Sequence, residues 1–175
     1  QRWNIDAVYT DIDQMFQKEP IDVVSICTPA ETHYAVLKKI VRYPIKAIFC
    51  EKPIATKVSE AQKMIALCRA KGILLQINHQ RRFDPLHQKI KSLLETKKYG
   101  GVQQVNVYYT AGINNTGTHI IDLLLFFFGD VQWVEGIRGK NLSHKEDDPN
   151  YDGLLLFKSG HMATFQACDV KQYLI

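Results

Sequence analysis

Three short apolar runs, each followed by a helical pattern, constrain this chain more than any other feature. The runs cover residues 21–27, 45–50 and 73–77 and are rich in Ile, Val and Leu. Continuous apolar runs of this length are typical of parallel strands that are covered on both faces. Strands that alternate with helices favour right-handed crossovers within one sheet. We therefore predict an α/β unit with a parallel sheet.

Local signals mark the ends of several helices. Asp84 followed by Pro85 predicts a helix start, because proline lacks an N–H that the first turn does not need. Residues 59–62, Ser-Glu-Ala-Gln, have the spacing of a capping box, and Gly72 is placed to end the helix that they open. The helix after Asp84 has an apolar stripe that we expect to be buried: Leu86, Ile90, Leu93 and Leu94.

The pattern changes after residues 100–101. Apolar residues alternate with polar ones over 105–109, as in a strand with one face exposed. A helix is predicted over residues 116–128, and polar residues 141–150 are expected to form a mobile loop. Three further strands are predicted, over 131–138, 151–158 and 161–170. The second half is therefore predicted to be an α+β domain with an open, largely antiparallel sheet, and the predicted domains are 1–99 and 100–175.

Composition excludes several classes of function. The net charge is only +4 and the basic residues are scattered, which does not favour nucleic-acid binding, although a phosphate-bearing ligand would suit this surface. The longest apolar stretch, 120–128, is far shorter than the roughly 20 residues of a membrane-spanning helix. The four cysteines and six histidines lack metal-ligand spacing, so we expect no metal site and reduced core thiols in a cytoplasmic protein.

An acid and a base follow the second apolar run directly. Glu51 and Lys52 stand between that run and Pro53. Ligands of open α/β sheets bind outside the carboxyl ends of the strands, so these two side chains are candidates for chemistry. A solvated charge pair at the start of a loop explains them equally well.

The predicted helix 116–128 is almost entirely apolar except for His119 and Asp122. Residues three apart lie on one face of a helix, so the two side chains could simply satisfy each other. His119 also lies in the first turn, beside a polar entry, where a histidine can act as an acid or a base. The adjacent Arg81 and Arg82 either bind an anion or belong to a solvated face.

Four motifs in one order carry a family resemblance. They are Thr28-Pro29-x-x-x-His33, Cys50-Glu51-Lys52-Pro53, Asn78-x-x-Arg81-Arg82-Phe83-Asp84-Pro85 and Gly117-Thr118-His119-Ile120-Ile121-Asp122-Leu123. From about Asp11 onward the chain resembles the glucose-fructose oxidoreductase, inositol dehydrogenase and rhizopine catabolism family (Gfo/Idh/MocA). The resemblance implies a Rossmann domain that binds NAD or NADP and a C-terminal domain that carries the site for a small, sugar-like substrate.

The resemblance also implies roles for individual residues. Lys52 and His119 match catalytic residues of the family, and the Lys52-Pro53 peptide is expected to be cis. The residues expected to line the cofactor are Cys27, Thr28, Pro29, His33, Glu51 and Pro53. Those expected near the substrate are Asn115, Arg81 and Asp122. A homo-oligomer that forms through the C-terminal sheet is also expected.

Two departures from the family pattern matter. No two of the 10 glycines have G-x-G spacing, so the phosphate-binding turn of the family is missing and we expect an N-terminally truncated member. Asn115 stands where the family often has an aspartate, and an amide cannot share a proton with an imidazole. His119 must therefore act with Lys52 or alone. Members of the family that act on nucleotide-linked sugars tolerate such a change, so the resemblance favours a sugar or nucleotide-sugar substrate.

The sequence leaves three functions open. The first is an NAD(P)-dependent oxidoreductase that transfers hydride between nicotinamide and a hydroxyl of a sugar, cyclitol or nucleotide-sugar. The second is a non-enzymatic, dinucleotide-sensing co-repressor of the same fold, and the third is an inactive fragment. The presence of both Lys52 and His119 favours the enzyme.

Overall fold

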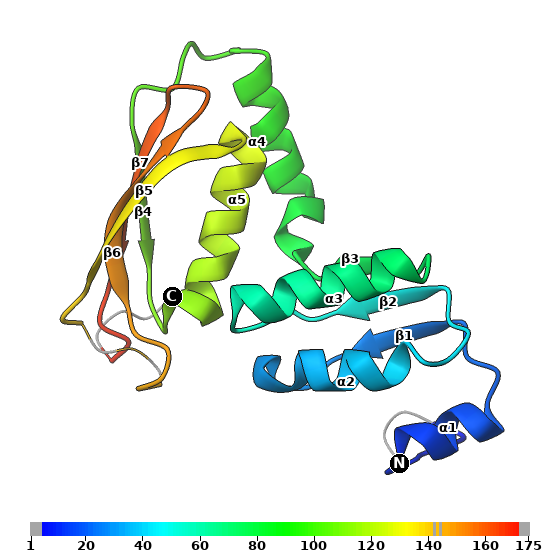
Figure 1. Cartoon of the computed structure of the whole chain (residues 1–175). Helices are drawn as coiled ribbons and strands as arrows, with labels where there is room; N and C mark the ends of the chain where they lie inside the picture. Colours follow the sequence, from blue (N-terminus) through cyan, green and yellow to red (C-terminus); the bar gives the residue numbers. More distant parts are fainter. Residues whose placement is uncertain (1–4, 142, 144, 172–175) are drawn as a thin grey trace. The chain divides into compact units, whose positions relative to one another are not determined.

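A computed structural model describes residues 5–141, 143 and 145–171 of the chain (Figure 1). The chain divides into two compact units between Asn78 and His79. This division precedes the predicted domain boundary near Gly100, because the helix that begins at Pro85 packs within the second unit. The functional division into 1–99 and 100–175 stays a prediction.

The first unit contains the predicted parallel sheet. Its elements are α1 (Ile12–Lys18), β1 (Val23–Ile26), η1 (Ala30–Thr32), α2 (His33–Ile40), β2 (Ala47–Cys50), α3 (Val58–Ala70) and β3 (Leu74–Ile77). The strands lie in the order β1-β2-β3, and both neighbouring pairs are parallel. The three predicted strands and their crossover helices are therefore confirmed.

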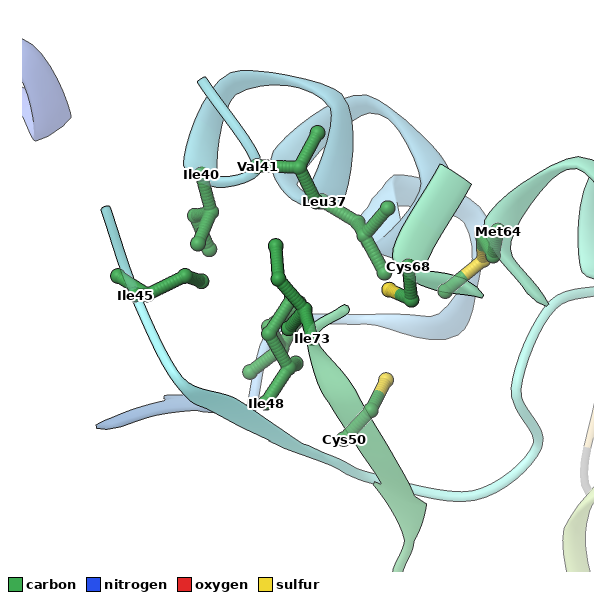
Figure 2. Packing of buried hydrophobic residues seen from close by; sticks show 10 residues of the cluster. Leu37, Ile40, Val41, Ile45, Ile48, Cys50, Met64, Cys68 and Ile73 are labelled. Atoms are coloured by element: carbon green, nitrogen blue, oxygen red, sulfur yellow. The ribbon is translucent and has the colours of Figure 1, made fainter. Parts of the chain in front are cut away.

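Helices α2 and α3 supply the buried side chains that cover one face of this sheet. Leu37 and Met64 are fully buried and belong to the same apolar cluster as Ile48, which Figure 2 shows. On the opposite face Val23 is 59% exposed and Leu74 is 67% exposed. The prediction that both faces are covered is therefore wrong for the described residues, since alternate side chains of each strand reach solvent.

The helix ends follow the sequence signals only in part. The side chain of Asp84 accepts hydrogen bonds from the first-turn amides, including that of Leu86 at 2.8 Å, as predicted. Helix α3 begins at Val58, so Ser59 lies inside the first turn and the predicted capping box is wrong. Gly72 has a φ of +66° and ends the helix as expected. Leu86 is 65% exposed, which contradicts its predicted burial.

The second unit is built on a four-stranded sheet. Its elements are η2 (Gln80–Phe83), α4 (Pro85–Glu95), β4 (Val105–Tyr109), the π-helical turn η3 (Ile113–Gly117), α5 (Thr118–Phe128), β5 (Val131–Arg138), β6 (Tyr151–Phe157) and β7 (Met162–Ala167). The strand order is β4-β7-β6-β5. The β4–β7 pair is parallel and the other two pairs are antiparallel, which confirms the largely antiparallel prediction.

Helix α5 covers one face of the second sheet. Leu124 packs with Tyr109, Phe157 and Phe165 of the strands. Helix α4 contacts α5 through Lys91, whose Nζ donates to the carbonyl oxygen of Phe126 at 2.6 Å. In the part of the chain that the structure describes, none of the helices combines the length and apolar character needed to cross a membrane.

Candidate functional site

The carboxyl ends of the three parallel strands gather several predicted site residues. The amide of Glu51 donates to Ile26 O at 2.9 Å, and the amide of Asn78 donates to Cys50 O at 2.8 Å. These two bonds continue the strand pairing by one residue, so they fix the positions at which the chain leaves the sheet after β2 and β3. Cys27, Thr28 and Pro29, the predicted cofactor residues after β1, are all exposed at this end.

The carboxylate of Glu51 is held in place by its neighbours. Its Oε1 accepts from Nδ2 of Asn78 at 2.7 Å, and its Oε2 accepts from the amide of Lys52 at 3.3 Å. The Lys52-Pro53 peptide is cis, as predicted. Asn78 was not predicted as a site residue, although its place directly after β3 is the same signal that singled out Glu51 after β2.

His33 lies at the start of α2 with no exposed surface. Its Nε2 is 2.8 Å from Thr28 O, and its Nδ1 is 3.0 Å from Pro53 O. The ring thus links the turn after β1 to the turn after β2, since whichever nitrogen carries the proton donates to one of these carbonyls. Its predicted contact with the cofactor stays a prediction, and the geometry favours a supporting role behind both turns.

The cysteines near these turns differ in exposure and reactivity. Burial, and next the charge of Glu51, raises the pKa of the Cys50 thiol to about 12. Burial also raises the pKa of Cys68. Cys27 is exposed, so the prediction that the cysteines are core thiols is wrong for it, although all four are free thiols as expected.

Two predicted residues of the second unit lie at the entry to α5. Asn115 belongs to η3 and is exposed, and His119 is partly buried in the first turn of α5. The carboxylate of Asp148 accepts hydrogen bonds from the backbone amides of Asn114 at 2.8 Å and Asn115 at 3.0 Å. Asp148 was not predicted, because it lies in the polar segment that we expected to be mobile.

Asp122 is a buried residue whose carboxylate is bound by Arg82. The Nε of Arg82 is 2.9 Å from both carboxylate oxygens, and its Nη2 is 2.7 Å from Oδ1. The Nδ1 of His79 lies 3.6 Å from the same oxygen. Asp122 therefore has a structural partner in Arg82, a contact that the sequence did not predict. The substrate roles of Asp122 and Arg81 stay predictions.

Comparison with known proteins finds a family match for the N-terminal part of the chain. Residues 1–79 match the model of the Gfo/Idh/MocA family, which is described as an oxidoreductase family with an NAD-binding Rossmann fold. Over these residues the chain is similar to this family. The predicted resemblance is thereby confirmed.

Curated relatives include named sugar and cyclitol dehydrogenases. D-apiose dehydrogenase of Paraburkholderia graminis is 28% identical over 148 residues, which cover 75% of this chain and 39% of that protein. Inositol 2-dehydrogenase of Rhizobium meliloti is 35% identical over 99 residues, which cover 55% of this chain and 29% of that protein. The chain thus matches well under two thirds of the length of these relatives.

Solved structures share the fold at low identity. An oxidoreductase from Agrobacterium radiobacter, described in complex with NAD+, L-tartaric acid and magnesium, has a TM-score of 0.84 and 21% identity, and the match covers 99% of this chain and 56% of that one. The WlbA dehydrogenase from Bordetella pertussis, described in complex with NADH and UDP-GlcNAcA, has a TM-score of 0.79 and 20% identity, with coverage of 91% and 52%. These matches confirm the α/β fold with its additional mixed sheet.

Proposed function

We propose that this chain is part of an NAD(P)-dependent oxidoreductase that acts on a hydroxyl of a sugar, cyclitol or nucleotide-sugar. The observation that carries the proposal is the arrangement at the strand ends. There an oriented Glu51, Lys52 and Pro53 follow the central strand β2, beside the exposed turn at Thr28, in a chain whose residues 1–79 match an oxidoreductase family. The curated dehydrogenases among its relatives support a substrate of this class.

NAD or NADP is the cofactor that the strand ends fit. The exposed residues Cys27–Pro29 and the Glu51–Asn78 pair offer backbone and side-chain groups that can hydrogen-bond an amide or a ribose hydroxyl. The sequence has no G-x-G turn, so these residues would hold the nicotinamide end rather than the pyrophosphate. The bound cofactor supplies a ring carbon, C4, that accepts hydride.

Lys52 and His119 have complementary roles in this proposal. The Lys52 ammonium donates a hydrogen bond to the substrate hydroxyl oxygen and stabilises its developing negative charge. His119 removes the hydroxyl proton as general base while hydride leaves the adjacent carbon. The alcohol thereby loses two electrons and one proton with the hydride and a second proton to the histidine, and becomes a carbonyl. Asn115, one turn before His119, is proposed to hydrogen-bond another hydroxyl of the substrate.

The open face of the second sheet supports the proposed homo-oligomer. Trp133, Leu156 and Met162 are directly paired across β5, β6 and β7 and so share one face. Trp133 is 47% exposed and Met162 is 55% exposed. Exposed apolar patches of this kind favour association. Light scattering on wild type and on Trp133→Glu is expected to show a smaller particle for the variant.

The proposed activity is tested by incubating the full gene product with NAD+ or NADP+ and a panel of aldoses, cyclitols and nucleotide-sugars. The absorbance of reduced nicotinamide is expected to rise with at least one of them, and Lys52→Ala is expected to abolish that rise. Tight dinucleotide binding without turnover of any substrate would contradict the enzyme and favour the co-repressor.

A further inference from the structure

The backbone that enters α5 is bound by a single short segment of the polar loop. The amides of residues 112–115 are four consecutive donors, and all four bonds go to residues 148–150. Gly112 N donates to Asn150 Oδ1 at 3.0 Å and Ile113 N to Pro149 O at 3.2 Å. Asn114 N and Asn115 N donate to the two carboxylate oxygens of Asp148, at 2.8 and 3.0 Å. The sequence prediction of a mobile loop is therefore wrong for residues 148–150.

This contact is built into the interior of the unit. Asp148 is 8% exposed and Asn150 is 1% exposed. Gly112 has a φ of +97°, and a Cβ at this position would lie 2.2 Å from Oδ2 of Asp148. Asn150 also donates from Nδ2 to the carbonyl oxygen of Asn141 at 3.2 Å, which fixes the loop end that carries Asp148. The carboxylate of Asp148 therefore lies close to the start of the helix, where Gly112 leaves room for it and Asn150 fixes the loop that carries it.

The physical reason for this arrangement is that the first backbone amides of a helix need hydrogen-bond acceptors from outside the helix. The first amides of a helix have no partner within it, and a buried amide without a partner is costly. A carboxylate forms stronger, charge-assisted bonds to such amides and interacts favourably with the positive end of the helix dipole. Thr118 continues the chain of contacts, because its Oγ1 donates to Asn114 O at 3.1 Å and to Asn115 O at 3.0 Å. The next residue along the chain is His119.

We propose that Asp148 is a positioning residue that fixes the orientation of His119 and Asn115 for catalysis. This proposal rests on the proposed function, in which His119 is the base. Asp148 acts through the backbone of residues 114–115, one turn before His119, and does not itself contact the reacting atoms. Misplacement of a catalytic group by about 1 Å can cost about 10² in rate, so loss of this anchor should reduce kcat.

The test uses Asp148→Ala and Asp148→Asn in the full gene product. Asp148→Ala is expected to lower kcat by about 10- to 100-fold while the Kd for the dinucleotide stays within about twofold. Asp148→Asn should lose less activity, because its carboxamide oxygen can still accept a hydrogen bond from one of the two backbone amides, that of Asn114 or that of Asn115. The rate of amide hydrogen exchange at Asn114 and Asn115 is expected to rise in both variants, and to rise more in Asp148→Ala than in Asp148→Asn. Asp147→Ala is the matched control, since it removes the same charge from an exposed position of the same loop.

Several outcomes would overturn the positioning role. Unchanged kcat in both Asp148 variants of an active enzyme is one, and an equal loss in Asp147→Ala is another. A loss of dinucleotide affinity as large as the loss of kcat would also overturn it, because it would show a general structural effect. If Asp148→Ala does not fold, Asp148→Asn decides by the same criteria. A wild type without turnover would refute the proposed function itself and this role with it, whereas hydrogen exchange would still report the backbone contact separately.

Discussion

Arg82 forms a bidentate, hydrogen-bonded ion pair with Asp122. The Nε of Arg82 is 2.9 Å from both carboxylate oxygens, and its Nη2 is 2.7 Å from Oδ1. The hydrogen bond to Asp122 raises the pKa of the Arg82 guanidinium above its usual value. The planar guanidinium matches the two oxygens in a way that lysine cannot. Because Asp122 lies on α5, the pair fixes the helix that carries His119 against η2.

Replacing Arg82 should therefore destabilise the second unit. Arg82→Ala leaves a buried carboxylate without its main partner, and the free energy of unfolding should fall by about 1–3 kcal/mol. The lower end of that range accounts for solvent screening, because the Arg82 side chain is 39% exposed. Arg82→Lys keeps the charge but not the paired geometry and should lose less. Urea denaturation of the wild type, Arg82→Ala and Arg82→Lys measures the three free energies of unfolding.

Arg81→Ala is the control for this prediction. The carbonyl oxygen of Arg81 lies 2.9 Å from Nδ1 of His87, so the described contact of this residue uses the backbone and survives the substitution. The free energy of unfolding of Arg81→Ala should stay within about 0.5 kcal/mol of that of the wild type. Equal losses for the two arginines would contradict the assigned role of the ion pair.

Thiol modification should separate the cysteines of the first unit. Because burial raises the pKa of Cys50 to about 12 and also raises that of Cys68, both remain protonated thiols at pH 8. Cys27 is exposed and should react first with iodoacetamide, as peptide mass spectrometry can show. Saturating dinucleotide in the full gene product should slow this reaction if Cys27 lines the cofactor. Preferential labelling of Cys50 would refute the burial argument.

The same region should lose stability when His33 is removed. His33→Ala leaves the carbonyl oxygens of Thr28 and Pro53 without the buried ring that contacts them, and the free energy of unfolding should fall by about 1–3 kcal/mol. Lys39→Ala, at an exposed position of the same helix, should change it little. Thermal denaturation of both variants provides the comparison. An unchanged midpoint for His33→Ala would show that the two turns do not depend on the ring.

Local sequence patterns predicted the elements well and the long-range contacts poorly. The strand runs, the Asp84 cap and the Gly72 stop depend on neighbouring residues, and each is present. The Arg82–Asp122 pair joins residues 40 positions apart, and the contacts of Asp148 join residues more than 30 apart. Spacing carries no information about such pairs. A polar segment such as 141–150 is compatible with solvent or with helix capping, and only the fold decides between them.

The absence of a glycine-rich turn leads to a prediction about binding. The pyrophosphate of a dinucleotide normally rests on the amides of such a turn, and this sequence has no G-x-G spacing. A protein with the present 175 residues should therefore bind NAD+ or NADP+ weakly or not at all in calorimetry. Micromolar binding would show that the phosphates are held elsewhere, for example by residues at the strand ends.

The final prediction concerns catalysis by Lys52 and His119 in the full gene product. General-base catalysis is typically worth about 10² to 10⁴ in rate, so His119→Ala should lower kcat by that factor and leave the dinucleotide Kd unchanged. Lys52→Ala should reduce kcat at least as much, because it removes the donor that stabilises the developing alkoxide. Asn115→Asp should be tolerated if a carboxylate can again pair with the histidine.

The double variant shows whether the two residues serve one step. If both act on the same hydroxyl, Lys52→Ala combined with His119→Ala should cost much less than the product of the single losses, since residues that act as a unit are not additive. Single-turnover kinetics with saturating substrate isolate that step from binding and release. Fully multiplicative losses would indicate that the two residues contribute independently. Near-normal turnover of His119→Ala would refute its role as the base and favour the dinucleotide-sensing alternative.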